Sequence, residues 1–437
     1  MTHVTVVGAG FAGCEAAWTL AKNGIPVTLW EMKPQKFSPA HHSPDFAELI
    51  CSNSFKASRL ESAAGLLKAE MERLGSLCVP CAKETAVAAG GALAVDRDRF
   101  SALVTEKIRN HPLITVREGE ITEIPDGNVI IATGPLTSEA LSAAIGELIS
   151  AEYLSFFDAA APIVEASSID MDKVFFAARY GRGDADYINC PFDTESYEKF
   201  AEELANAESV ELKEFEKRDF KVYEGCMPIE VMARRGADTM RFGPLKPVGL
   251  RDPKTGHRPW AAVQLRRENE AGTLYNIVGF QTNLKFPEQK RVFSMIPGLE
   301  HAAFARYGVM HRNTFMNSPK LLHADFSLRS DPRIFFAGQM TGVEGYMESA
   351  SSGLIAGIAM VRRLRGLSPL ELPETTMLGA LTRYISSSTA EDFQPMGSNM
   401  GILPPLPEKI KGKAERYGAL AARAMRDLEQ TLRDLEA

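Results

Sequence analysis

The chain has 437 residues, of which 45% are hydrophobic and 24% charged, and a formal net charge of −7. This length and composition predict a globular protein of two domains, and the negative charge disfavours nonspecific nucleic-acid binding by the whole surface. Six cysteines are too few for a disulfide framework in so long a chain, and no stretch predicts a signal peptide or a membrane-spanning helix, so we expect reduced thiols and a cytoplasmic location.

The N-terminal segment follows the order strand, glycine turn, helix, strand and acid. Val4–Val7 is a short apolar run that leads into Gly8-Ala9-Gly10-Phe11-Ala12-Gly13, a complete G-x-G-x-x-G. Apolar residues at helical spacing follow, and Pro26–Trp30 is a second strand-like run that ends at Glu31. This order predicts a dinucleotide-binding βαβ unit.

Each position in this unit has a physical reason. Gly8 permits a tight turn, Gly10 has no Cβ to obstruct a pyrophosphate, and Gly13 lets the helix pack closely on the strand. The helix N-terminus favours phosphate, and a carboxylate at Glu31 suits the adenosine ribose hydroxyls. The motif by itself does not choose between FAD and NAD.

Two later segments favour FAD. The predicted strand at 128–132 ends in Ala132-Thr133-Gly134, and the predicted strand at 333–337 runs into a second glycine-rich turn at 338–345, followed by an apolar helix. Two glycine turns hundreds of residues apart are typical of flavoproteins that bind FAD along its length. Helices are also expected at 61–74 and 96–108, a strand at 113–117, and a charged helix at the C-terminus.

The middle of the chain changes in character. From about 151 to 267 glycine turns become scattered and aromatic and basic residues alternate, which predicts an inserted domain. Between Lys221 and Arg267 there are ten Lys or Arg and four Asp or Glu, so this acidic chain contains a basic segment. The segment fits a confined phosphate-binding face or, alternatively, chance clustering on a solvated surface. We expect domain limits of 1–150, 151–267, 268–370 and a helical tail at 371–437.

Two cysteines are candidates for chemistry. Cys51 stands at the edge of an apolar run beside small polar residues, and Cys226 precedes Met227-Pro228 at the expected start of a helix, where a thiol pKa is lowered. For each, a buried structural cysteine is the alternative. Cys78 and Cys81 form a C-x-x-C with no second pair, so we interpret them as structural or incidental and expect no metal site.

Taken together, these segments resemble the folate- and FAD-dependent tRNA (uracil-5-)-methyltransferases of bacteria, over nearly the whole chain. The segments around Cys51 and Cys226 are specific to that family, whereas the glycine turns are shared with the sister family that modifies the wobble uridine. The segments are Gly8–Ala16, Cys51–Lys56, Gly91–Arg97, Gly225–Glu230, Gly338–Tyr346 and Phe393–Met396.

The resemblance implies an α/β fold, with a Rossmann-like FAD-binding domain of the glucose-inhibited-division and glutathione-reductase type and an inserted α+β domain. It implies methylation of the T-loop uridine of tRNA at C5, giving ribothymidine. The carbon would come from 5,10-methylenetetrahydrofolate, and the electrons from NADPH or NADH through FAD. Uracil C5 becomes nucleophilic once a thiolate adds at C6, for which Cys226 is the candidate, and Cys51 is the candidate base at C5.

The resemblance and the motifs together give the expected binding residues. RNA phosphates are expected at Arg234, Arg235, Arg241, Lys246, Arg251, Lys254 and Arg258, because basic side chains contact the backbone. FAD is expected at Gly8, Ala9, Gly10, Phe11, Ala12, Gly13, Glu31, Lys33, Ala132, Thr133, Gly134, Gly338, Gln339, Gly342, Gly345, Tyr346, Glu348, Ser349 and Ala350.

Other classes remain open from the sequence. The same chemistry could act on ribosomal RNA, since motifs near the active site would not differ. A small-molecule flavin oxidoreductase would explain the glycine turns but not the basic segment or the paired thiols. A non-catalytic RNA-binding scaffold is disfavoured by the intact thiol segments. The oligomeric state is also left open.

Overall fold

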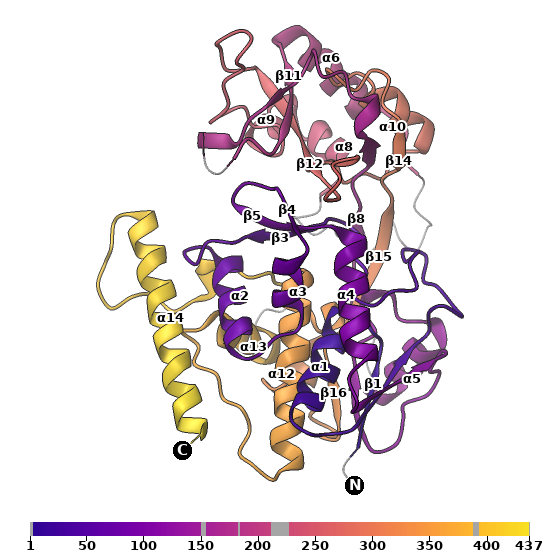
Figure 1. The fold of residues 1–437 in the computed structure, drawn as a ribbon, viewed down its shortest axis with the longest axis vertical. Coiled ribbons are helices and arrows are strands. Elements are labelled where there is room, and N and C mark those ends of the chain that lie inside the picture. The colour runs from indigo at the N-terminus through magenta and orange to yellow at the C-terminus, as the bar shows by residue number, and fades with distance from the viewer. Residues whose placement is uncertain (1–2, 150–153, 182–183, 211–226, 388–392, 437) are drawn as a thin grey trace.

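Two sheets with separate hydrophobic cores organise the chain. The computed structural model describes residues 3–149, 154–181, 184–210, 227–387 and 393–436. A five-stranded sheet lies in the larger part of the molecule, which contains both termini, and a six-stranded sheet lies in the smaller part above it (Figure 1). The chain passes from the larger part to the smaller and back, so the smaller part is an inserted domain.

The five-stranded sheet is parallel and has the strand order β16-β7-β1-β2-β6. Its central strand β1 is almost wholly apolar and buried, as expected for a parallel strand covered on both faces. The predicted Rossmann-like architecture is therefore confirmed. The strands are β1 (Val4–Val7), β2 (Val27–Glu31), β6 (Ile114–Glu118), β7 (Asn128–Ile131) and β16 (Ile334–Phe336).

Helices α1 (Phe11–Lys22) and α12 (Tyr346–Leu364) pack closely against each other beside this sheet (Figure 1). Their approach depends on a small residue, because a Cβ at Gly353 would lie 2.0 Å from the Ala12 carbonyl oxygen. The N-termini of both helices are thereby brought to the same edge of the sheet. The first domain also contains α2 (Ala63–Arg73), α3 (Cys78–Glu84), α4 (Arg97–Arg109), α5 (Glu139–Ile149), α11 (Ser318–Leu321), α13 (Met377–Ser387) and α14 (Lys413–Glu436).

A small antiparallel sheet of three strands lies between the two domains (Figure 1). It consists of β3 (Ser54–Ala57), β5 (Ala92–Val95) and β4 (Ala86–Val87), in that order. The sequence did not predict these strands, which are short and pair residues far apart in the chain. They place the segment after Cys51 directly below the inserted domain.

The inserted domain is built on a sheet of order β10-β11-β12-β13-β9-β14, in which neighbouring strands are antiparallel. Its core contains the phenylalanines of β11, α6 and the segment before α10, whose rings contact one another. Its elements are β9 (Ile163–Glu165), β10 (Phe175–Phe176), β11 (Ile188–Phe192), α6 (Thr194–Asn206), α8 (Ile229–Arg234), α9 (Ala237–Phe242), β12 (Ala261–Arg267), β13 (Leu274–Ile277), α10 (Phe286–Phe293) and β14 (Phe304–Arg306).

The inserted domain extends beyond position 267, where we expected it to end. Strands β13 and β14 both pair with β9, so the last strand of this sheet ends at Arg306. The connection to the first domain is the antiparallel pair of β8 (Leu154–Ala159) and β15 (Met310–Phe315). The expected tail at 371–437 also differs, because Met377 and Leu378 of α13 lie in the core of the first domain.

None of the helices in the described ranges combines the length and apolar composition needed to cross a membrane.

Candidate functional site

A cavity of about 670 Å³ lies at the carboxyl edge of the parallel sheet. It is lined by the segments that follow β1, β2, β7 and β16, and it reaches residues of the inserted domain, among them Met232, Pro244 and Asn276. Its volume falls in the range of roughly 300–1,000 Å³ common for small-molecule sites, and ligands of open parallel sheets bind at this edge. The cavity is therefore the candidate dinucleotide site.

The N-terminus of α1 forms one wall of the cavity. Gly10 is its N-cap residue, no side chain caps this end, and a Cβ at Gly10 would meet no atom within 4 Å. The N–H groups of a first helical turn lack intrahelical acceptors and favour a phosphate. By contrast, a Cβ at Gly13 would lie 1.7 Å from the Gly8 carbonyl oxygen. Gly13 therefore serves packing, whereas Gly8 to Ala12 line the cavity.

Glu31 ends β2 at the cavity wall and is only 7% exposed. Its carboxylate accepts hydrogen bonds from the Ala9 N–H at 2.7 Å and from the Lys33 N–H at 3.0 Å. These bonds fix the turn after β1 relative to the end of β2. A carboxylate has capacity for further donors, so Glu31 remains able to accept a ribose hydroxyl.

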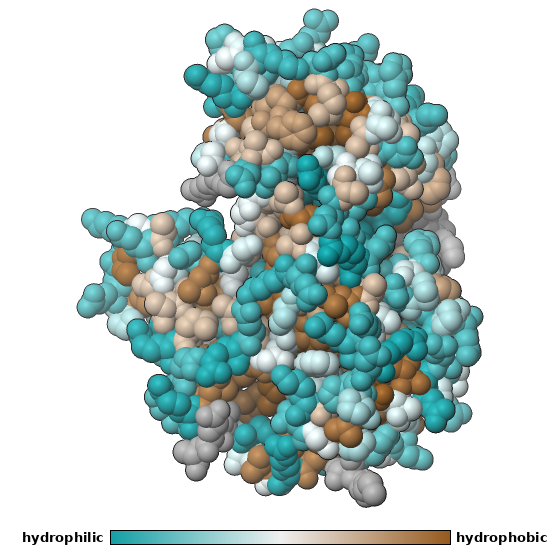
Figure 2. All heavy atoms as spheres, viewed as in Figure 1, coloured by the Kyte–Doolittle hydropathy of each residue, from teal (hydrophilic) through white to brown (hydrophobic). Residues whose placement is uncertain are grey.

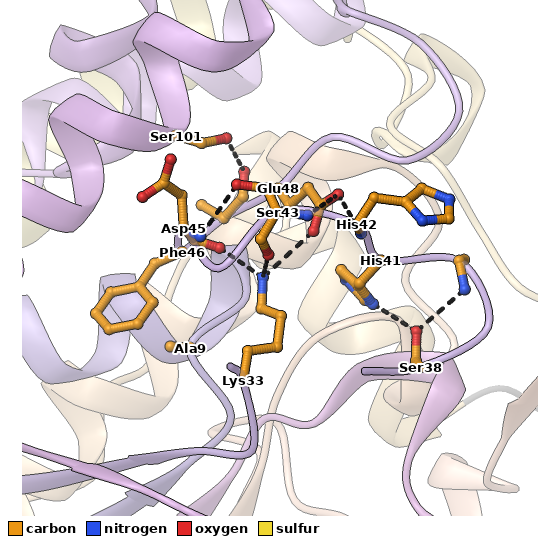
Figure 3. A network of polar contacts seen from close by, with 12 residues as sticks. Ala9, Lys33, Ser38, His41, His42, Ser43, Asp45, Phe46, Glu48 and Ser101 are labelled. Atoms are coloured by element: carbon orange, nitrogen blue, oxygen red, sulfur yellow. Dashed lines mark hydrogen bonds and ion pairs between the residues drawn. The ribbon is translucent and has the colours of Figure 1, made fainter. Parts of the chain in front are cut away.

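Lys33 lines the cavity, but its ammonium group is directed into the following loop (Figure 3). Its Nζ donates to the carbonyl oxygens of Ser43 at 3.0 Å and Asp45 at 2.5 Å, and it lies 3.3 Å from the Glu48 carboxylate. Glu48 in turn accepts the His42 N–H at 2.8 Å. The Lys33 side chain therefore stabilises this loop, while its backbone N–H donates to the Glu31 carboxylate.

The second glycine turn forms the opposite wall. Gly338 and Gly345 have φ angles of 87° and 120°, in the region that favours glycine, and Gly345 caps α12 without any side-chain cap. Two uncapped helix N-termini therefore face one cavity, which fits a ligand with negative or acceptor groups at two places. Of the residues expected here, the cavity lining includes Gly338, Gln339, Gly345, Tyr346, Glu348 and Ser349, and from the turn after β7 it includes Ala132, Thr133 and Gly134.

Two expected cofactor residues lie behind this wall. A Cβ at Gly342 would lie 2.6 Å from the Phe393 ring, so Gly342 allows close packing of that ring. Ala350 is fully buried on α12. Neither residue lines the cavity, in contrast to the other expected residues of this turn.

An ion pair between a buried carboxylate and an exposed ammonium lies at the start of α12. The Glu348 carboxylate accepts from Lys56 Nζ at 2.9 Å and from Ser398 Oγ at 2.7 Å, and its side chain is 2% exposed. Burial alone would raise the pKa of the Glu348 carboxyl, but Lys56 and Ser398 hold it below its usual value. Glu348 is therefore ionised at neutral pH, and the pair places a positive and a negative group on the cavity wall.

Cys51 lies on the cavity wall next to Tyr346. The Cys51 N–H donates to the Tyr346 hydroxyl at 2.7 Å, and burial raises the pKa of that phenol far above its usual value. Cys51 is half-buried and forms no disulfide. The other candidate thiol, Cys226, lies outside the described residues.

The residues after Cys51 are held by the inserted domain. Arg266, at the end of β12, donates to the Ser52 hydroxyl at 2.8 Å and to the Asn53 side-chain oxygen at 2.9 Å. Asn53 donates to the carbonyl oxygens of Val95 and Arg267 at 2.9 and 2.8 Å. Because Arg266 and Asn53 are nearly fully buried, this network fixes Cys51 at the junction of the domains.

Sequence reasoning did not single out the cavity residues of the inserted domain. Arg266 directly follows the mostly apolar run Ala261–Leu265 of β12, and this was the available signal. Asn276 has a buried side-chain nitrogen, Nδ2, without a hydrogen-bond partner, and it lines the cavity. An orphaned donor in a cavity wall fits an acceptor on a bound molecule.

Some of the expected RNA-binding side chains hydrogen-bond to backbone carbonyl oxygens of the inserted domain, and others are exposed on its surface. Arg234 donates to the carbonyl oxygens of Ala205 and Ala207 at 2.9 and 3.1 Å, so its guanidinium caps the end of α6. Lys254 Nζ donates to the Asp172 carbonyl oxygen. Arg235, Arg251 and Arg258 are exposed on the surface of the inserted domain, Lys246 is half-buried, and Arg241 lies over the ring of Trp260.

Cys78 and Cys81 lie in α3, and both are buried. Burial raises the pKa of both thiols, that of Cys81 to about 12, so both are protonated and unreactive at neutral pH. Among the described residues no cluster of three or more His, Cys, Asp or Glu is arranged to hold a metal ion.

Comparison with known proteins agrees with this geometry. The family model for glucose inhibited division protein A matches residues 3–368. The chain is 58% identical over 433 residues, 99% of each chain, to the methylenetetrahydrofolate--tRNA-(uracil-5-)-methyltransferase TrmFO of Enterococcus faecalis. It is 59% identical over 428 residues to the protein of the same name from Heliobacterium modesticaldum, covering 98% of this chain and 97% of that one.

Among solved structures, Aquifex aeolicus GidA in its form II crystal matches with a TM-score of 0.70 at 15% identity, over 99% of this chain and 76% of that chain. At this identity the likeness supports the fold alone. The two relatives described above match at more than half identity over nearly the whole of each chain, and such matches support membership of a family as well as the fold. The chain therefore belongs to the glucose inhibited division protein A family and, within it, to the group whose members are named methylenetetrahydrofolate--tRNA-(uracil-5-)-methyltransferase.

Proposed function

We propose that this protein methylates C5 of the T-loop uridine of tRNA in the cytoplasm. The carbon comes from 5,10-methylenetetrahydrofolate and the reducing equivalents from NADPH or NADH through bound FAD. One observation carries the proposal: Cys51 and residues of the inserted domain line the same cavity as both glycine turns. A dinucleotide site alone would not need a thiol or a second domain in its wall.

The cavity residues fit FAD. Gly10 leaves open space at the uncapped N-terminus of α1, where a pyrophosphate would be bound by backbone N–H groups. Glu31 would bind the adenosine ribose, and the start of α12 would face the ring system. When bound, FAD would supply the redox chemistry that turns a methylene into a methyl group.

The thiols would carry the covalent steps on uracil. Addition of a thiolate at C6 activates C5 as a nucleophile, and a soft sulfur can leave again afterwards. We assign the addition to Cys226 and removal of the C5 proton to Cys51. The hydrogen bond from the Cys51 N–H to Tyr346, and the contacts of Arg266 with Ser52 and Asn53, would position Cys51 for this step.

The test is transfer of label from the methylene carbon of 5,10-methylenetetrahydrofolate to unmodified tRNA in the presence of reduced nicotinamide. We expect label on the T-loop uridine with the wild-type protein and its loss in both Cys226→Ala and Cys51→Ala. Cys190→Ala is the matched control, because Cys190 is buried in the core of the inserted domain. That variant should retain transfer.

Each outcome has a distinct meaning. Absence of label on tRNA from a wild-type protein that contains reducible FAD would contradict the proposal, and label on ribosomal RNA would redirect it to that substrate. Full transfer by Cys51→Ala would remove Cys51 from the chemistry while leaving the substrate assignment intact.

A further inference from the structure

Phe242, the last residue of α9, is 84% exposed, more than any other large hydrophobic side chain in the described ranges. A single exposed aromatic is common on protein surfaces. The surroundings of Phe242 distinguish it, because its backbone is fixed, its neighbours are aromatic and basic, and the chain continues from it into the cavity wall.

The backbone on both sides of Phe242 is anchored. Met240 and Leu245 are each fully buried, and the Met240 carbonyl oxygen accepts the N–H groups of Gly243 at 3.1 Å and Leu245 at 2.9 Å. The Ala262 N–H of β12 donates to the Leu245 carbonyl oxygen at 3.1 Å. The ring of Phe242 is therefore held out from a rigid turn.

This turn leads directly to the cavity. Pro244 lines the cavity and packs against Gly279, where a Cβ would lie 2.4 Å from the Pro244 Cβ. Only Gly243 separates Pro244 from Phe242. The exposed ring is thus two residues from the wall of the candidate site.

A second aromatic side chain lies beside the same turn. The guanidinium carbon of Arg241 is 3.7 Å from the centroid of the Trp260 ring, and Arg241 Nε donates to the Trp260 carbonyl oxygen at 3.1 Å. Trp260 is 39% exposed. A guanidinium fixed on an indole ring is a stable flat surface, since both stacking and the cation–π attraction hold it.

The segment of sequence that carries these rings is basic, which favours a polyanion. From Met227 to Arg267 the chain has nine Lys or Arg and three Asp or Glu. In the view of Figure 2, apolar atoms lie in the middle of the inserted domain and are bordered by hydrophilic side chains. Exposed aromatic rings among basic residues are the combination that binds unpaired nucleotides, because the rings stack on bases while the cations meet phosphates.

We propose that Phe242, with the Arg241–Trp260 pair beside it, stacks on unpaired bases of the tRNA as the target uridine enters the cavity. The inference rests on the proposed function, which requires a uridine to be turned out of a folded arm. Stacking on Phe242 would stabilise that unstacked arrangement without reading a sequence.

The experiment measures the Kd of unmodified tRNA for FAD-loaded wild type, Phe242→Ala, Phe242→Tyr and Phe286→Ala. We expect Phe242→Ala to weaken binding about tenfold, in line with the loss of one base–aromatic stack, and Phe242→Tyr to restore it. Phe286 is the matched control, because it is 51% exposed in the same domain on α10. Its replacement should leave the Kd within about twofold.

The salt dependence separates stacking from charge. Phe242→Ala should leave the slope of log Kd against log salt unchanged, whereas Arg251→Ala should reduce it by about one, the loss of one phosphate contact. An unchanged Kd for Phe242→Ala would overturn the proposal. So would a raised KM for 5,10-methylenetetrahydrofolate with an unaltered tRNA Kd, since the ring would then face folate.

The methyl-transfer assay distinguishes failure of this inference from failure of the proposed function. Transfer to tRNA by the wild type together with an unchanged Kd for Phe242→Ala would overturn the stacking contact alone. Weaker tRNA binding by Phe242→Ala, in a protein whose wild type transfers no label to tRNA, would support the stacking surface and reject the activity.

Discussion

The Glu31 carboxylate joins the two segments that would bind the adenosine half of a dinucleotide. Removing it in Glu31→Ala leaves the buried N–H groups of Ala9 and Lys33 without their acceptor, at a cost on the order of 1–3 kcal/mol for each unsatisfied group. We expect a lower flavin content per protein, measured by visible absorbance, and an earlier unfolding midpoint in urea. Glu31→Gln should lie between, because its amide retains one acceptor oxygen.

Glu123→Ala is the control for that comparison, since Glu123 is exposed. Unchanged flavin content in Glu31→Ala would contradict the proposed ribose contact, whatever happens to stability. Glu31 and the glycines were predictable because each acts within a contiguous βαβ unit. The position of the Lys33 ammonium was not predictable, because its partners Ser43 and Asp45 belong to a loop, and residue spacing does not reveal how that loop folds back.

At the scale of elements, Glu70 couples α2 to the N-terminus of α13. Its carboxylate accepts the N–H groups of Met377 and Leu378, both at 2.8 Å, and it is fully buried. Burial raises the pKa of Glu70 from 4.5 to about 7, outweighing the two hydrogen bonds that lower it. The folded state therefore binds more protons than the unfolded state between these two pH values.

The protonated Glu70 carboxyl stabilises the fold fully below about pH 4.5, because its pKa is higher in the folded state than in the unfolded state. This stabilisation is lost as pH rises through about 7, by on the order of 3 kcal/mol at most. Urea unfolding at about pH 5 and about pH 8 should show a larger loss for wild type than for Glu70→Gln, which cannot ionise. Parallel losses in the two proteins would show that Glu70 has an ordinary pKa.

Elements with strong local periodicity were predicted well, and those formed by distant pairing were not. The expected helix at 96–108 is α4, Arg97–Arg109, with Asp96 accepting the Arg99 N–H as its cap at 3.2 Å. Strand β14 joins the inserted sheet through β9, which lies more than a hundred residues earlier, and β13 pairs with β9 as well as with its chain neighbour β12. Periodicity identifies a strand but not its partner, and this is why the expected domain limit came too early.

At the scale of the whole molecule, the candidate site depends on how the two domains meet. Asn276 and Pro244 reach the cavity only through the docking of the inserted domain, so no local pattern could place them there. The sequence predicted both glycine turns and Cys51, which line the cavity from the first domain. It also predicted a basic segment in the inserted domain, but not that the Arg234 side chain would hydrogen-bond to the carbonyl oxygens at the end of α6.

The domain junction contains two ion pairs of different burial, and they provide a matched test. Arg97 pairs with Glu268 at 2.5 Å with side-chain exposures of 14% and 2%, whereas Arg99 pairs with Glu270 at exposures of 50% and 66%. Arg97 also donates to the Leu49 carbonyl oxygen at 2.5 Å, two residues before Cys51. The buried pair therefore links the inserted domain to the segment that carries the candidate thiol.

Glu268→Ala would leave the Arg97 charge buried without its partner, which costs about 3–5 kcal/mol, whereas Glu270→Ala would remove a surface pair worth about 0–1 kcal/mol. We expect the first variant to lower the free energy of unfolding by that larger amount and the second to change it little. Replacing both Arg97 and Glu268 by Met should recover part of the loss, because Arg97 is then no longer buried without its partner, although Arg266 still loses the nearby Glu268 charge. Equal effects of Glu268→Ala and Glu270→Ala would mean that the junction is hydrated, and that Cys51 is held by the Arg266 contacts instead.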